Sequence, residues 1–96
     1  MGEMLFLNKV VIVTGGTRGI GRSIVLALCK EGADCAFTYA KNPAAAESLT
    51  KEIQGMGRRA MPFQLDVRDF EGTKKFVEEV KKEFGRIDIH AVTPSF

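Results

Sequence analysis

The stretch KVVIVTGGTRGIG, residues 9–21, joins a run of β-branched residues to a cluster of glycines. A continuous apolar run that glycines end is typical of a strand buried on both faces of a parallel sheet, and residues 9–14 are such a run. After Gly19 the apolar residues recur at helical spacing until a lysine and a glycine, at Lys30 and Gly32, that are typical of a helix end. These residues are Ile20, Ile24, Ala27 and Leu28. The stretch therefore predicts a buried strand, a glycine loop and a helix with this apolar face.

The remainder of the chain repeats the alternation of strand and helix. Strands are predicted over residues 34–40, 60–67 and 87–92, and helices between them. Asn42 and Asp69 are the expected N-caps of the two later helices. Opposite charges four residues apart predict the helix pairs Glu47–Lys51 and Glu78–Lys82.

Short connections between alternating strands and helices imply right-handed crossovers and a parallel sheet covered on both faces. The predicted fold is α/β, a Rossmann-like three-layer half-domain with strand order 3-2-1-(4). Pro62 supports this order, because a proline cannot donate a ladder hydrogen bond and is therefore expected on an edge strand, here the third.

Composition excludes several classes of function. The 96 residues, 45% hydrophobic and 27% charged, have room for one globular domain. A net charge of +2, evenly spread, argues against a nucleic-acid partner. The absence of a long apolar run and of a leader-like start argues against a membrane partner, so we expect a cytoplasmic protein. Cys29 and Cys35 match neither a redox nor a zinc spacing, so we expect free buried thiols and no metal site.

The glycine loop predicts a site for phosphate groups. Glycines allow a tight turn from strand to helix and let the backbone approach a pyrophosphate closely, while the first N–H groups of the helix point toward it. A loop that merely makes a turn is the alternative. The position of the loop between a first buried strand and an amphipathic helix favours the dinucleotide site.

The sequence TGGTRGIG after KVVIV resembles the coenzyme loop of the short-chain dehydrogenase/reductase family, and among its members the 3-oxoacyl-acyl-carrier-protein reductases in particular. EGADCAFTYAKN, LDVRD and FGRIDI continue the resemblance, which extends over residues 5–89. It implies that the loop surrounds the coenzyme phosphates and the adenosine ribose, and that Asp66 and Val67 hold the adenine. The loop residues concerned are Gly15, Thr17, Arg18, Gly19, Ile20 and Gly21. A local alternative for Asp66 is a turn that starts the next helix, and the two roles are compatible.

The end of the second strand favours NADP(H) over NAD(H). An NAD site usually places an acidic residue there to bind the 2'-hydroxyl of the ribose, and Tyr39 occupies that position. Arg18 from the glycine loop and Lys41 just past the strand can reach a 2'-phosphate at that position with positive charge. An ordinary surface lysine is the alternative for Lys41.

The resemblance ends after Ile89, and the reductases of the family go on to supply a catalytic Ser and a Tyr-x-x-x-Lys motif. The one tyrosine is Tyr39, with Pro43 rather than lysine four residues later, and we expect no role for His90 or Ser95 as an acid. We expect one truncated dinucleotide-binding domain over residues 1–96, with residues 90–96 as an unmatched tail and no catalytic residue of the family.

Three functions remain open from the sequence. The first is an NADP(H)-binding N-terminal half without catalysis of its own. The second is a weak NADPH-dependent carbonyl reductase that is active as an oligomer. The third is a self-associating fragment that binds nothing. In each case an apolar edge on the first or fourth strand predicts a homo-oligomer.

Overall fold

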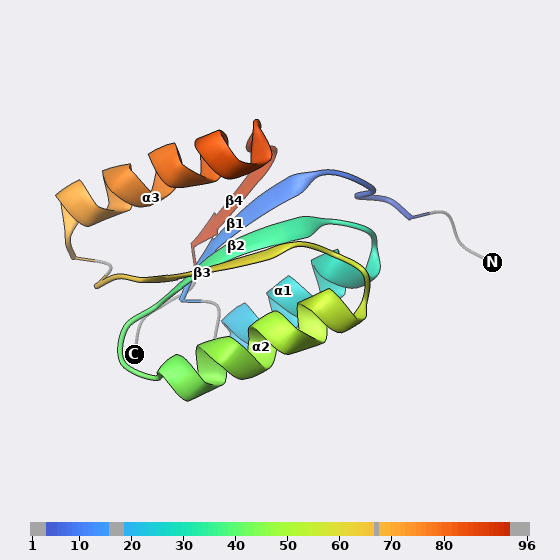
Figure 1. Ribbon diagram of the computed structural model, residues 1–96, viewed down its shortest axis with the longest axis horizontal. Coiled ribbons are helices and arrows are strands. Elements are labelled where there is room, and N and C mark those ends of the chain that lie inside the picture. The colour runs from blue at the N-terminus through green and yellow to red at the C-terminus, as the bar shows by residue number, and fades with distance from the viewer. Residues whose placement is uncertain (1–3, 16–18, 67, 93–96) are drawn as a thin grey trace.

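Four parallel strands and three helices make up the described part of the chain, which in the computed structural model comprises residues 4–15, 19–66 and 68–92. The elements are β1 (Val10–Thr14), α1 (Gly19–Lys30), β2 (Asp34–Tyr39), α2 (Pro43–Gly55), β3 (Ala60–Gln64), α3 (Phe70–Phe84) and β4 (Ile89–Val92). The sheet order is β3-β2-β1-β4. Helices α1 and α2 cover one face and α3 covers the other (Figure 1). The predicted fold class, sheet order and layers are confirmed.

Two apolar cores lie on the two faces of the sheet. One joins alternate residues of β1 and β2 to α1 and α2, with Phe37 at 0% exposure. The other joins the remaining face of the strands to Phe76 and Val80 of α3. Strands buried on both faces explain why the run over residues 9–14 shows no polar alternation.

The apolar face predicted for α1 is partly wrong. The buried residues of α1 are Gly21, Val25 and Cys29, whereas Ile20 is 66% exposed. The spacing of apolar residues in the sequence fixes the period of a helix but not its rotation about its own axis. In the structure, the face that contains small residues packs on the sheet, because small residues let the helix approach closely.

Helices α2 and α3 begin at the predicted caps. The side chain of Asn42 accepts the N–H of Ala45 at 3.0 Å, and that of Asp69 accepts the N–H of Gly72 at 2.9 Å. The predicted pair Glu47–Lys51 forms at 3.4 Å. The predicted pair Glu78–Lys82 does not form among the described residues, so Glu78 lies exposed without an ion partner there.

The two edges of the sheet differ from each other. β3 is an edge strand, as Pro62 predicted. β1 lies inside the sheet. Of the two strands expected at the other edge, β1 or β4, it is therefore β4 that forms it. The start of β4 is tied to β1 because Asp88 accepts the N–H of Val10 at 2.8 Å and pairs with Arg86.

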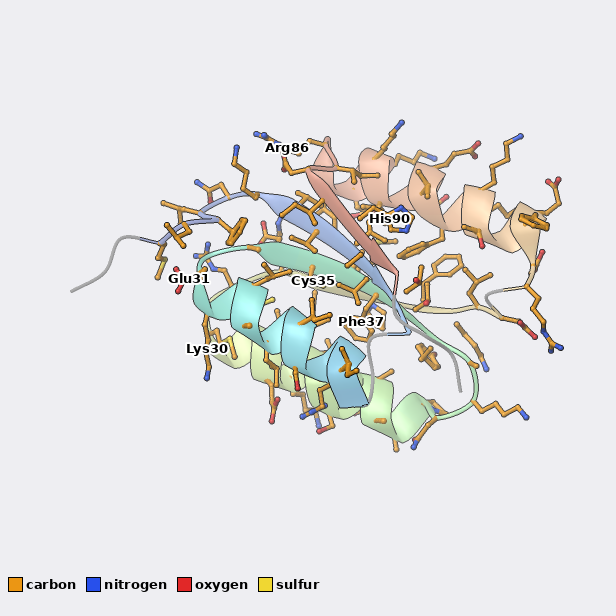
Figure 2. The ribbon with its side chains drawn as sticks, turned by 180° about the vertical axis from the view of Figure 1, so that it is seen from behind. Lys30, Glu31, Cys35, Phe37, Arg86 and His90 are labelled. Atoms are coloured by element: carbon orange, nitrogen blue, oxygen red, sulfur yellow. The ribbon has the colours of Figure 1, made fainter. Side chains whose placement is uncertain are left out.

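Both cysteines are buried, as expected, and they meet between α1 and β2. Figure 2 shows Cys35 pointing from β2 toward α1, where Cys29 lies in the same core. The hydrogen bond with Cys35 lowers the pKa of the Cys29 thiol, while the same bond and burial raise the pKa of Cys35. None of the described helices is long and apolar enough to cross a membrane.

Candidate functional site at the carboxyl edge of the sheet

The carboxyl ends of parallel strands lie at one edge, and this edge brings together residues that are far apart in sequence. Gly15 follows β1, Tyr39 ends β2 and Asp66 follows β3 by two residues. In open α/β sheets, ligands bind outside this edge. Of the other predicted site residues, Thr17, Arg18 and Val67 lie outside the described part of the chain.

Glycine is required on both sides of the loop between β1 and α1. Gly15 has a φ of 76° and Gly19 a φ of 58°, in the left-handed region that other residues rarely adopt. A Cβ built on Gly19 meets no atom within 4 Å, so the space beside it is open. Gly21 is buried in α1, where a glycine lets the helix lie close to the sheet. These conformations and this space fit a loop that approaches a phosphate group with its backbone.

Thr38 is a site residue that sequence reasoning missed. Its side chain is fully buried in β2, and its hydroxyl oxygen accepts the N–H of Gly15 at 2.9 Å. This bond ties the start of the glycine loop to the neighbouring strand. The signal was a threonine directly after the apolar run of β2, since a buried hydroxyl needs a hydrogen-bond partner.

The first turn of α1 contains no acidic residue of its own. Arg22 of that turn pairs with Glu52 of α2 at 2.8 Å. The N-terminal end of a helix carries partial positive charge, which favours anions in the first turn. The local electrostatics therefore agree with the glycine geometry.

Asp66 and Lys41 form the charged rim of the site. The Asp66 carboxylate accepts three hydrogen bonds from Arg68: from its backbone N–H at 2.9 Å, from Nε at 3.1 Å and from Nη2 at 2.7 Å. These bonds lower the pKa of Asp66 to about 2, and the positive charge of Lys41 adds a smaller lowering. The carbonyl of Asp66 accepts the N–H of Asp69, so the turn role that the sequence left open does occur.

Tyr39 is the last residue of β2, and Lys41 follows it by two residues. Tyr39 is half-buried and its carbonyl accepts the N–H of Leu65, which joins the ends of β2 and β3. Lys41 is exposed, and no acidic side chain stands at the last residue of β2. An anion beside the end of β2 would therefore meet a lysine rather than a carboxylate of that strand.

The fold and this edge agree with a known family. A family model described as short chain dehydrogenase matches residues 9–91. The chain belongs to the short-chain dehydrogenase family. Residues 89–92 form β4, within the strand that the sequence predicted over residues 87–92.

Several members of the short-chain dehydrogenase family resemble the chain in sequence. A hydroxynaphthalene reductase of Aspergillus fumigatus is 40% identical over 82 residues, which are 85% of this chain and 30% of that protein. A 3-oxoacyl-acyl-carrier-protein reductase of Staphylococcus epidermidis is 39% identical over 83 residues, 86% of this chain and 34% of the reductase. The chain thus spans about a third of the length of these relatives.

Solved structures of short-chain dehydrogenases share the architecture. One from Burkholderia cenocepacia, in complex with NADP, superimposes with a TM-score of 0.87 at 39% identity and covers 88% of this chain and 35% of its own. A dehydrogenase/reductase from Sinorhizobium meliloti reaches a TM-score of 0.92 at 33% identity, with 98% of this chain and 37% of that chain covered.

Proposed function

We propose that this chain is an NADP(H)-binding module of the short-chain dehydrogenase family. The observation that carries the proposal is the loop between β1 and α1, where Gly15 and Gly19 adopt left-handed conformations and the space beside Gly19 is open. In the proposed complex the loop and the first turn of α1 hold the diphosphate, with Thr17 and Ile20 alongside, and Gly21 lets α1 lie close. Asp66 and Val67 hold the adenine.

The preference for NADP(H) over NAD(H) rests on charge. Tyr39 ends β2 without repelling a 2'-phosphate, and Lys41 carries its positive charge close enough to affect Asp66. Arg18 is proposed as the second cation. The Burkholderia cenocepacia relative, whose structure contains NADP, supports the choice of coenzyme. A hydrogen bond to a charged group contributes about 1.5–3 kcal/mol, so loss of one such contact weakens binding about tenfold or more.

Titration of the chain with NADPH and NADH tests the proposal. Coenzyme fluorescence is expected to change on binding, and NADPH is expected to bind more tightly. Lys41→Ala or Arg18→Ala is expected to weaken NADPH binding about tenfold and to leave NADH nearly unchanged. Lys51→Ala, an exposed lysine on α2, is the matched control and should affect neither coenzyme. Equal losses for both coenzymes would refute the 2'-phosphate assignment, and absence of any binding would refute the coenzyme site.

The proposal is limited to coenzyme binding. When bound, a nicotinamide coenzyme supplies or accepts a hydride, and reduction of a carbonyl also needs a positioned acid. The chain has no Tyr-x-x-x-Lys, and His90 lies exposed on β4, on the side of α3 (Figure 2). We therefore propose no catalysis by these residues alone. Consumption of NADPH with a panel of aldehydes and ketones, abolished by Gly19→Val, would favour the weak reductase instead.

We also propose that copies of the chain associate through the β4 edge. β4 pairs on one side with β1, and the described chain places no strand on its other side. An unpaired strand edge is a template for pairing with another strand. Backbone amide exchange in residues 89–92 should slow as the protein concentration rises. Exchange that does not depend on concentration would exclude this contact.

A further inference from the structure

The turn between β2 and α2, over residues 40–42, is held at two points. The carbonyl of Ala40 accepts a hydrogen bond from Nε2 of Gln64 at 3.1 Å. The side chain of Asn42 accepts a backbone N–H of α2 at 3.0 Å. The backbone of Lys41 therefore lies between two anchored residues.

The sheet places Gln64 for this contact. Gln64 is the last residue of β3 and lies beside Tyr39 in the parallel pairing of β2 with β3. The next residue, Leu65, donates its N–H to the carbonyl of Tyr39 at 2.9 Å. The side-chain amide of Gln64 thus reaches one residue beyond the last pair of the two strands. The contact lies on the side of β2 away from β1 and β4 (Figure 1).

The charge of Lys41 is available at this edge of the sheet. Lys41 is exposed, and within residues 4–15, 19–66 and 68–92 no ion pair includes it. Bonds from Arg68 are the main cause of the lowered pKa of Asp66, and the positive charge of Lys41 adds to it. The ammonium group therefore lies near Asp66 without being neutralised by an ion pair in the described chain.

We propose that Gln64 is a positioning residue for Lys41 and thereby strengthens the preference of the site for a 2'-phosphate. The inference rests on the NADP(H) site proposed above. A lysine side chain loses conformational freedom when its ammonium group binds a ligand, and a mobile backbone adds to that loss. The bond to Ala40 restricts the backbone before the coenzyme binds, so less freedom is lost on binding. Gln64 touches no atom of the coenzyme in this proposal and acts through Lys41.

Removal of the Gln64 amide tests this role. Q64M keeps the approximate length of the side chain and removes the N–H donor. NADPH is expected to bind about threefold more weakly to this variant, equivalent to about 0.65 kcal/mol, while NADH binds unchanged. The readout is the ratio of the two dissociation constants, because a general loss of stability would affect both coenzymes alike. Q54M removes an exposed amide from α2 and is the matched control, which should leave both dissociation constants unchanged.

Two further measurements show whether Gln64 acts through Lys41. In a K41A background Q64M should no longer change the affinity for NADPH, because the cation that Gln64 positions is absent there. In the free chain, nitrogen-15 NMR relaxation should give a lower order parameter for the backbone amide of Lys41 in Q64M than in the wild type. The relaxation measurement does not depend on coenzyme binding.

Three results would overturn the inference. The first is folded Q64M protein with the wild-type ratio of NADPH to NADH dissociation constants. The second is an equal weakening of both coenzymes by Q64M. The third is the same loss of NADPH affinity in the K41A background as in the wild-type background. A wild-type chain that binds neither coenzyme would instead refute the proposed function, and this inference with it.

Discussion

Removal of the Thr38 hydroxyl tests whether β2 positions the glycine loop. Thr38→Val preserves the shape of a side chain that is 0% exposed and removes the oxygen that accepts the Gly15 N–H at 2.9 Å. A hydrogen bond of this kind contributes about 1 kcal/mol net. For a domain of this size about 1 kcal/mol lowers the melting temperature by about 4–8 °C.

The same change is expected to weaken coenzyme binding. If the whole contribution of about 1 kcal/mol serves to hold the loop in its binding conformation, affinity for NADPH falls up to about fivefold. Differential scanning calorimetry measures the stability, and fluorescence titration measures the affinity.

Thr50→Val is the matched control for this prediction. The Thr50 hydroxyl donates to the carbonyl of Ala46 at 2.8 Å within α2, away from the loop. The control therefore removes a hydroxyl of the same type and should change stability without changing affinity. Thr38→Val protein that binds NADPH like the wild type would refute the positioning role of Thr38. Equal weakening by Thr50→Val would assign the effect to stability rather than to the loop.

Three further changes have defined outcomes. Gly19→Ala forces a φ of 58° on an L residue, so it should lower the free energy of unfolding by about 1–2 kcal/mol in thermal unfolding and weaken coenzyme binding. Gly57→Ala, at a φ of 79°, is the control and should lower the free energy of unfolding by a similar amount without affecting coenzyme binding. Phe76→Ala empties a core position at 0% exposure and should lower the free energy of unfolding by about 3–5 kcal/mol in urea; a loss below about 1 kcal/mol would contradict the packing described. Arg68→Ala should raise the pKa of Asp66 from about 2 toward its ordinary 3.8, as followed by carbon NMR. Because folding lowers this pKa, the wild-type contact stabilises the fold above about pH 4 and loses its effect as the pH falls toward 2; an unchanged midpoint in the variant would exclude the role of Arg68.

Local signals in the sequence predicted most of the element boundaries, because each depends on residues close together in the chain. The glycines of the loop, the caps Asn42 and Asp69, and Pro62 at the edge all act within a few residues of their own position. Some strands are shorter than expected, such as β3, which ends at Gln64. The strand preference of the local residues does not determine where such a strand ends. Strand ends depend on which neighbour continues the ladder, and that neighbour belongs to another part of the chain.

Contacts across elements were not predictable in the same way. The rotation of α1, which leaves Ile20 exposed and buries Val25, follows from how closely a helix can approach this sheet. The bond between Thr38 and Gly15 joins residues that are 23 positions apart, and no spacing rule connects them. The failure of Glu78 to pair with Lys82 likewise depends on side-chain conformations that sequence spacing does not fix.

The sequence by itself determined the alternation of strands and helices, the parallel sheet with β3 at its rim and the position of a glycine loop before a helix. Periodicity, turn residues and caps are local properties, and the connections leave one favoured order of strands. Only the tertiary structure decided which strand forms the second edge and which helix face is buried. It also decided which distant groups meet at the carboxyl edge, because these depend on packing free energies summed over elements that become neighbours only when the chain folds.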